Sequence, residues 1–262
     1  MPELPDLENF KGNIYRKLTS KKLIDVNVYN PQKVITPQSA LKEELVGREL
    51  AIINRLGKEL LFDFAGGRVV AVHLMLNGKI SIVGGADDAA KINFRIFSFV
   101  FEKETVVFSD MGGLCTIRYK PSLDGAPDAL GGDFTLEYFL NAARRKRTVN
   151  VKSFLIDQKV IKGIGNAYAD EILWLARVSP YSTVGQIPEA VMIGLYNAIG
   201  SALRDAIASI KAISPDIISG EERSFLKVHN KSKKRTDTGF PIIEERIASK
   251  ITYYTEEQIL YS

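Results

Sequence analysis

The stretch LIDQKVIKGIGNAYADEILWLARVSP, residues 155–180, places two glycines between two segments of helical periodicity. The pattern predicts a helix that ends near Gln158, a tight turn at Gly163 and Gly165, and a second helix that begins near Asn166. The N–H groups at a helix start carry the positive end of its dipole, so such a turn suits a phosphate. Glycines alone do not exclude an ordinary helical hairpin with a glycine C-cap.

Helical periodicity continues on both sides of this stretch, in TLEYFLNAARR (135–145) and PEAVMIGLYNAIGSALRDAIASI (188–210). We therefore expect a helical domain over residues 135–219. A loop rich in Gly, Pro and Asp, PSLDGAPDALGGD (121–133), precedes it and marks a boundary, with a linker expected over residues 125–134.

Residues 1–124 have a different pattern, with one amphipathic helix over residues 7–18 followed by short β-rich runs. Turn signals separate the runs, so this part is expected to form a sheet sandwich or a barrel. The tail, residues 220–262, returns to strand-like runs, FPIIEERIAS and KITYYT, that suit a small hairpin. The fold class expected is α+β and multidomain.

The composition is that of an ordinary globular protein, with 45% hydrophobic and 25% charged residues in 262 and a net charge of +4. No apolar run reaches the ~18–20 residues that span a bilayer, and no signal segment opens the chain, so we expect a cytoplasmic protein without a membrane partner. A single cysteine, Cys115, and two histidines, His73 and His229, cannot build a Cys/His zinc site. We expect no metal and no cofactor.

The chain begins MPELPDLENF (1–10), which by itself fits a capped lead-in to a helix. If Met1 is removed, however, the nitrogen of Pro2 changes from an amide to a secondary amine. An amine is a nucleophile, whereas an amide is not.

GIGNAYADE and the opening MPELPD resemble, in order and spacing, two motifs of the formamidopyrimidine-DNA glycosylase and endonuclease VIII family. The resemblance implies an N-terminal antiparallel β-sandwich with a leading helix, a helix-two-turns-helix domain and a C-terminal finger. It also implies that Met1 is removed, that Pro2 attacks C1′ of a damaged nucleoside, and that Glu3 transfers protons beside it. Gly163 and Gly165 are then expected to contact DNA.

The family resemblance extends to three further positions that are expected to contact DNA. RLGKELLFDF (55–64) places Lys58 at a lysine near the lesion, and HLMLNG (73–78) places His73 at a phosphate. Asn166 matches the asparagine that holds the backbone beside the lesion. Structural roles are the alternative for all three, as a surface lysine, a strand histidine and an N-cap.

The tail resembles the family's zinc finger without the metal. Aligned without gaps, four other residues stand where the finger has cysteines: Arg235, Thr238, Thr255 and Gln258. Lys250 falls at the position of the finger arginine, where it can offer a phosphate a point charge but no bidentate fork. We expect this zincless finger to be held by packing of Tyr253, Tyr254 and isoleucines.

Several positions differ from the family pattern. Asp6 replaces the usual second acid, and in DMGGLC (110–115) Gly113 and Leu114 replace an arginine and a phenylalanine that fill the DNA stack. The third stack-filling residue aligns with Leu76, with Met75 one position earlier. The missing arginine leaves the opposite base open. The segment over residues 214–228 is also short, which leaves the preferred lesion open, 8-oxoguanine included.

The function expected is a DNA glycosylase of base excision repair that removes oxidised or ring-opened bases and cleaves the abasic site through a Schiff base. Its partner is double-stranded damaged DNA, and the protein is expected to act as a monomer. A catalytically weak binder of damaged DNA is the alternative if Met1 is retained. A generic α+β protein would instead show no salt-dependent affinity for DNA.

Overall fold

The computed structural model describes residues 1–262, and the chain divides into two compact units. The first unit comprises Met1–Pro2, Asp6–Asp124 and Ser214–Glu221. The second comprises Glu3–Pro5, Gly125–Ile213 and Glu222–Ser262. The four-part division expected from the sequence is finer than this grouping and stays a prediction.

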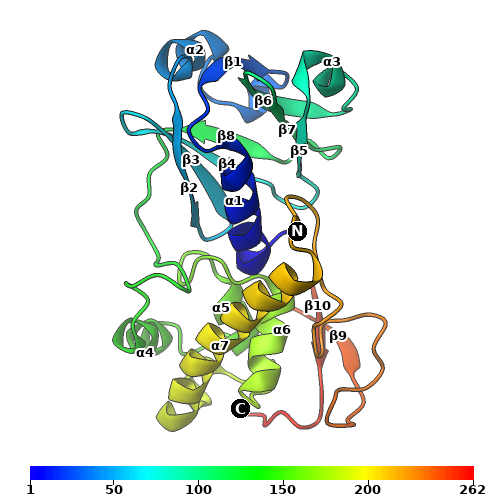
Figure 1. Cartoon of the computed structure of the whole chain (residues 1–262). Coiled ribbons are helices and arrows are strands. Elements are labelled where there is room, and N and C mark those ends of the chain that lie inside the picture. Colours follow the sequence, from blue (N-terminus) through cyan, green and yellow to red (C-terminus); the bar gives the residue numbers. More distant parts are fainter. The chain divides into compact units, whose positions relative to one another are not determined.

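The first unit contains two four-stranded antiparallel sheets (Figure 1). One has the strand order β1 (Leu23–Val28), β6 (Arg95–Phe101), β7 (Thr105–Ser109) and β5 (Lys79–Val83). The other has the order β2 (Leu50–Leu56), β3 (Glu59–Phe64), β4 (Arg68–His73) and β8 (Thr116–Tyr119). The strands coincide with the β-rich runs of the sequence, and the two separate sheets favour the sandwich over the barrel.

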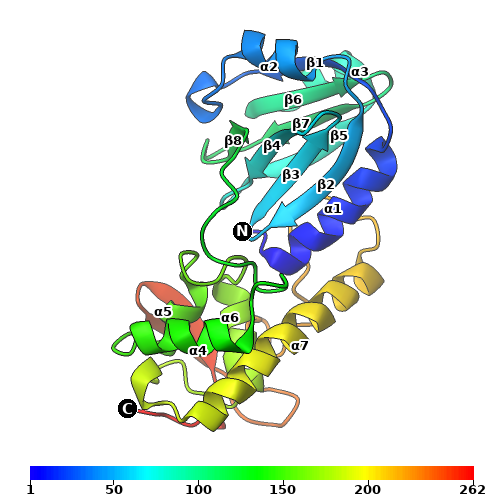
Figure 2. The same ribbon diagram turned by 90° about the vertical axis from the view of Figure 1, so that its left-hand side faces the viewer.

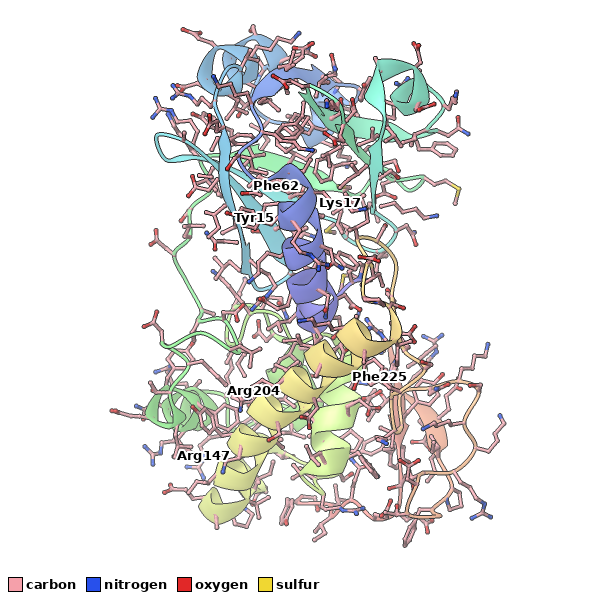
Figure 3. The ribbon with its side chains drawn as sticks, viewed as in Figure 1. Tyr15, Lys17, Phe62, Arg147, Arg204 and Phe225 are labelled. Carbon is pink, nitrogen blue, oxygen red and sulfur yellow. The ribbon has the colours of Figure 1, made fainter.

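Phenylalanines from both sheets meet in the core of this unit. Phe62 of β3 is labelled in Figure 3. Its ring centroid lies 5.3 Å from that of Phe99 of β6 and 5.7 Å from that of Phe108 of β7. The Phe62–Phe108 contact is edge-to-face, a favourable geometry for aromatic pairs. Alternating apolar residues on the strands therefore produce the core that their period predicts.

Helix α1 (Leu4–Leu18) adds one apolar face to this core. Phe10, Ile14 and Leu18 are fully buried at helical spacing. On the same helix Tyr15 is partly buried against this core and Lys17 is exposed (Figure 3). The sequence pattern does not predict α2 (Gln38–Leu45) or α3 (Gly85–Ala90), because each is short and buries only one or two apolar residues. A 3₁₀ turn, η1 (Pro31–Lys33), precedes α2.

The second unit is helical, with α4 (Leu136–Arg145), α5 (Val151–Ile156), α6 (Asn166–Leu175) and α7 (Glu189–Ile213), and a 3₁₀ turn η2 (Val184–Gln186). Helix α7 packs against both α4 and α6 (Figure 2). Thr135 and Asn150 cap α4 and α5 by accepting hydrogen bonds from backbone N–H groups. Helix α5 ends two residues before the predicted end, and α6 begins where the sequence predicts.

The hairpin of β9 (Ile243–Ile247) and β10 (Lys250–Tyr254) completes this unit, with β10 against α6. Its two turn residues, Ala248 and Ser249, have φ of 47° and 66°, the left-handed pair of a type I′ turn. The α+β fold class is thereby confirmed. None of the helices has the length and apolar composition needed to cross a membrane.

Candidate active site

Pro2 is buried and lines a cavity of about 680 Å³ in the first unit. The cavity wall comes from the loop between β4 and β5, the loop before β6, and the end of β7. Leu76 belongs to the first of these loops, so two predicted site residues share one cavity. Phe94 and Met111, from the other two, were not predicted. Met111 lies in DMGGLC (110–115), where the family resemblance singled out only Gly113 and Leu114, and nothing in the sequence relates the loop of Phe94 to Pro2.

The carboxylate of Glu221 lies at the N-terminus of the chain. The ammonium group of Met1 forms an ion pair with Glu221, which also lines the cavity. While Met1 is present, resonance draws the lone pair of the Pro2 nitrogen into the peptide bond. The nitrogen can act as a nucleophile only after Met1 has been removed.

Lys58 and His73 lie within electrostatic reach of each other in the first unit. Lys58 is in the two-residue turn between β2 and β3, and His73 ends β4 opposite Glu59. Burial, then the charges of Lys58 and Arg118, lower the pKa of His73 from 6.5 to about 4. Its Nδ1 accepts a hydrogen bond from the Met75 N–H at 3.0 Å, so the proton of the neutral ring is on Nε2. His73 can therefore offer a phosphate a neutral N–H donor.

The lowered pKa of His73 predicts a pH-dependent stability. Between pH ~6.5 and ~4 the unfolded chain binds a proton that the folded chain excludes, so the free energy of unfolding falls as the pH falls, by at most about 3 kcal/mol. Above pH ~6.5 the histidine makes no contribution to the slope. We expect His73→Gln to remove this part of the slope, measured by urea unfolding at pH 4, 5, 6 and 7. Parallel curves for the two proteins would contradict the assignment.

The stack-filling candidates are exposed to different degrees. Leu76 is 56% exposed and Leu114 is 38% exposed, whereas Met75 is partly buried with φ of 55°. The Asp110 carboxylate shapes the turn before Leu114 by accepting the N–H groups of Gly112, Leu114 and Cys115 at 2.6–2.8 Å. Asp6, the expected secondary acid, is fully buried in the first turn of α1.

In the second unit, Glu3 supplies the N-terminal cap of α6. Its carboxylate accepts the N–H groups of Gly165 at 2.7 Å, Ala167 at 2.9 Å and Tyr168 at 3.4 Å. Gly165 occupies the N-cap position and has no side chain with which to cap the helix itself. A Cβ on Gly165 would lie 2.2 Å from Cδ of Glu3, so any larger residue at this position would clash with the Glu3 carboxylate. The two motifs of the family resemblance therefore touch each other.

Gly163 also uses its backbone groups inside the protein. Its N–H donates to Oε1 of Gln158 at 2.9 Å, and its carbonyl accepts the N–H of Leu4 at 3.2 Å. Both glycines are buried. The phosphate prediction depended on the N–H donors of Gly163 and Gly165. The amide oxygen of Gln158 accepts the first, and the Glu3 carboxylate, at the positive end of the helix, accepts the second.

Asn166 and two unpredicted residues fix the backbone beside Lys250. The carbonyl of Ile251 accepts Nδ2 of Asn166 at 2.8 Å and Nζ of Lys152 at 3.3 Å. Lys152 is 1% exposed and lies 2.7 Å from the equally buried Asp170 carboxylate. Burial lowers the pKa of Lys152, against the opposing effect of Asp170. Lys250 itself is exposed at the start of β10.

The expected finger is held by a carboxylate as well as by packing. Glu257 accepts hydrogen bonds from the Trp174 indole at 3.1 Å and Thr255 Oγ1 at 3.2 Å, and pairs with Arg177. Burial opposes its ionisation, but bonds from Thr238, Arg177, Trp174 and Thr255 outweigh burial and lower the pKa of Glu257 to about 2. Tyr253 is buried as expected, while Gln258 bonds Thr255 and Val178. The sequence does not predict this role of Glu257, because the residue lies in a polar stretch near the C-terminus where acidic side chains are usually exposed.

We expect Glu257→Gln to loosen the hairpin, because an amide can replace the carboxylate toward only some of its donors. Losing a charged acceptor costs about 1.5–3 kcal/mol, which lowers the unfolding temperature by several degrees. In the parent, the contribution is present above pH ~4.5 and is lost as the pH falls toward ~2. Calorimetry and amide hydrogen exchange at Thr252 and Tyr253 measure both effects. The neighbouring Glu256→Gln is the control, and equal behaviour of the two variants would remove Glu257 from this role.

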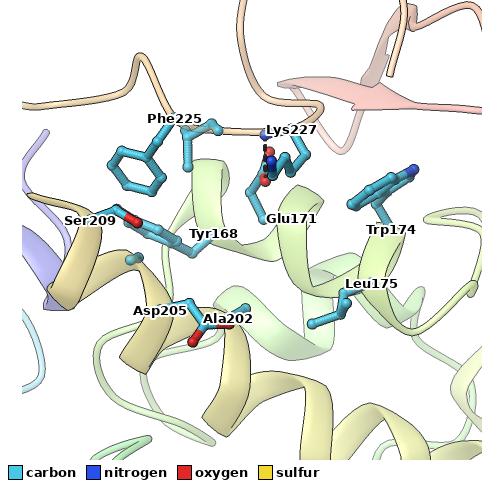
Figure 4. A pocket seen from close by; sticks show the side chains of 11 residues that line it. Tyr168, Glu171, Trp174, Leu175, Ala202, Asp205, Ser209, Phe225 and Lys227 are labelled. Atoms are coloured by element: carbon cyan, nitrogen blue, oxygen red, sulfur yellow. Dashed lines mark hydrogen bonds between the residues drawn. The ribbon is translucent and has the colours of Figure 1, made fainter. Parts of the chain in front are cut away.

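A second cavity, of about 230 Å³, lies between α6, α7 and residues 225–227 (Figure 4). Tyr168, Trp174 and Phe225 contribute aromatic rings to its wall. Glu171, at its edge, accepts the N–H groups of three successive residues at 2.7–2.8 Å: Lys227, Val228 and His229. Burial raises the pKa of Glu171 against these bonds. The carboxylate anchors the segment that leads to the hairpin.

A β-sandwich unit with Pro2 on a cavity, and a helical unit whose glycine turn receives Glu3, define the class of protein that the motifs indicated. The formamidopyrimidine-DNA glycosylase N-terminal domain matches residues 1–117, and the formamidopyrimidine-DNA glycosylase H2TH domain matches residues 126–216. The chain belongs to the formamidopyrimidine-DNA glycosylase family.

Individual relatives match over nearly the whole chain. The formamidopyrimidine-DNA glycosylase of Carboxydothermus hydrogenoformans is 32% identical, over 97% of this chain and 98% of its own. That of Pelotomaculum thermopropionicum is 30% identical, over 97% of both. Among solved structures, Lactococcus lactis Fpg in complex with DNA that contains an abasic site has a TM-score of 0.86 at 24% identity, over 97% of this chain and 98% of that one.

Proposed function

We propose that this protein is a bifunctional enzyme of base excision repair, which removes a damaged base from DNA and then cleaves the abasic strand. Family membership supports the glycosylase activity. The observation that carries the proposal further is the burial of Pro2 in the wall of a cavity. Glu3, the next residue in the chain, is held by three N–H groups and has little freedom to move.

The proposed reaction begins once Met1 has been removed. The lone pair of the Pro2 amine forms a bond to C1′ of the extruded nucleoside, and the bond from C1′ to the base breaks, with the electron pair leaving on the base. Glu3 carries protons between the sugar, the base and solvent. Opening of the sugar gives an iminium, which is the electron sink for β- and then δ-elimination of the two phosphates. Asp6 is the proposed secondary acid.

Binding of duplex DNA rests on separate donors in the two units. Lys58 and His73 are proposed to contact phosphates near the lesion, and Asn166 and Lys250 to hold the backbone beside it. Extrusion of a base costs a few kcal/mol of stacking, which these contacts and the apolar Leu76, Met75 and Leu114 offset. Neither metal nor cofactor has a part in this scheme, and a monomer suffices for it.

The relatives suggest a class of lesions. Lactococcus lactis Fpg has been solved with DNA that contains an abasic site or an oxidised pyrimidine, and a mutant of it with DNA that contains Fapy-dG. We propose that this chain likewise acts on ring-opened or oxidised bases and on abasic sites.

Borohydride trapping tests the proposal. Met1-processed protein is incubated with an abasic-site duplex and reductant, and we expect a stable covalent adduct together with β,δ-elimination products. Affinity should fall with salt at a slope near −0.9 per phosphate neutralised. Tight binding without an adduct would contradict the proposed enzyme activity. It would favour the alternative, a binder of damaged DNA whose Met1 remains paired with Glu221.

A further inference from the structure

Phe94 combines two features that are rarely found together in one residue. Its side chain is 60% exposed, and its φ is 56°, in the left-handed region. A bulky residue is a genuine outlier there, because Cβ approaches the following carbonyl oxygen. Neither burial of the ring nor a favourable backbone conformation accounts for a phenylalanine at this position.

The backbone of Phe94 is fixed by the sheet it precedes. Its carbonyl accepts the N–H of Asp110 at 2.9 Å, which continues the pairing of β6 with β7 beyond Arg95 and Ser109. The strained conformation is therefore imposed by the surrounding structure. Strain of this kind is concentrated at ligand-binding sites.

The ring of Phe94 belongs to an exposed apolar group around the cavity that Pro2 lines. Met111 is 76% exposed and Leu76 is 56% exposed, and both line the same cavity. The three residues come from three separate loops. Large apolar side chains gathered at the wall of one cavity indicate a ligand with an apolar face.

We propose that Phe94 is the platform on which the extruded damaged base stacks while C1′ is presented to Pro2. This rests on the proposed function. A planar base has the apolar face that this site requires. Stacking on an aromatic ring does not depend on the hydrogen-bonding groups at the edge of the base. Phe94 would thus set specificity for an unsaturated, planar lesion over a saturated, puckered one, and would have no role once the base has left.

The experiment compares base removal with abasic-site chemistry in the same full-length, Met1-processed protein. One duplex carries Fapy-dG, a second carries an oxidised pyrimidine that keeps a planar ring, and a third of the same sequence carries an abasic site. For Phe94→Ala we expect single-turnover base release to fall by about 5- to 150-fold, the range for losing one base–aromatic stack. Adduct formation on the abasic duplex should remain within about twofold of the parent.

Two further variants separate stacking from structure. Phe94→Tyr keeps a ring and should keep base release, whereas Phe94→Gly should lose base release but unfold at the parent's temperature or higher, because glycine relieves the strain. Ile35→Ala, at an apolar side chain that is 81% exposed outside the cavity, is the control and should change neither activity.

Each contrary result has a distinct meaning. Equal losses on the base-containing and abasic duplexes, or unchanged base release in Phe94→Ala, would overturn the platform. If the parent protein forms the abasic adduct but releases neither damaged base, the platform proposal is also overturned, whereas the proposed lyase activity stands. A parent that forms no adduct would instead overturn the proposed function.

Discussion

Protein that retains Met1 is expected to form no borohydride adduct with an abasic duplex, whereas processed protein is expected to form one. The two samples differ only in whether the nitrogen of Pro2 is an amide or an amine. A free α-amino group has a pKa near ~7.7–8, so an appreciable fraction carries its lone pair at neutral pH. An amide nitrogen has no available lone pair at any pH, because the pair is delocalised into the carbonyl group. The loss should be complete.

A matched pair of variants tests the same nitrogen within processed protein. Pro2→Gly should lose most of the adduct, because a flexible primary amine replaces the secondary amine and the ring that fixes its orientation. Lys250→Ala should keep the adduct at saturating DNA, with weaker binding and a salt slope that is smaller by about 0.9. Mass spectrometry of the N-terminus establishes which form is present. An adduct of equal yield with Met1 retained would require a different nucleophile, with Lys58 as the first to be replaced.

The strands and long helices could be predicted from the sequence because each has a strong local period. Burial at Phe10, Ile14 and Leu18 follows the 3.6-residue repeat, and the β-rich runs match eight strands of two sheets. The short helix over Gln38–Leu45 could not be predicted in this way, because only Leu41 and Leu45 are buried.

Long-range polar contacts account for most of what the sequence does not predict in the site. The pairing of Lys152 with Asp170, and the network around Glu257, join residues from separate elements. A finger without cysteines could be predicted from the residue count, but its carboxylate centre could not. The count of one cysteine and two histidines excludes a Cys/His zinc site, but it gives no indication of which side chain holds the finger instead.

For the glycine turn, the sequence predicts where the helix starts but not which group its N–H donors bind. The helix start at Asn166, with N–H groups able to bind an anion, follows from the pattern. Which anion those groups bind depends on a residue 162 positions earlier. Glu3 supplies that anion, so the motif positions the carboxylate that we propose to transfer protons.

Gly165→Ala is therefore expected to be among the most damaging single changes in the chain. With φ of −119° and ψ of −162°, Gly165 has an extended conformation that alanine also adopts, so the backbone does not forbid the substitution. The added Cβ, however, would lie 2.2 Å from Cδ of Glu3. Glu3 must move, and three buried N–H groups at the start of α6 lose their acceptor.

The expected cost has two parts that can be measured separately. Overpacking and loss of a charged cap should lower the free energy of unfolding by about 2–4 kcal/mol. Displacement of the Glu3 carboxylate, the proposed proton-transfer group, should slow base release by about 10²- to 10⁴-fold at a temperature where the variant remains folded. Glu3→Gln, which keeps the size of the side chain, should reproduce most of the kinetic loss with a smaller loss of stability.

Gly194→Ala on α7 is the matched control, since nothing lies within 4 Å of the added Cβ. Alanine is favoured over glycine inside a helix by about 0.5–1 kcal/mol, so this variant should be as stable as the parent or more stable, with unchanged activity. If Gly165→Ala behaved in the same way, the Glu3 carboxylate would not depend on the glycine turn. Because the same clash that destabilises α6 also displaces the carboxylate, the rate and the unfolding temperature should fall together only at Gly165.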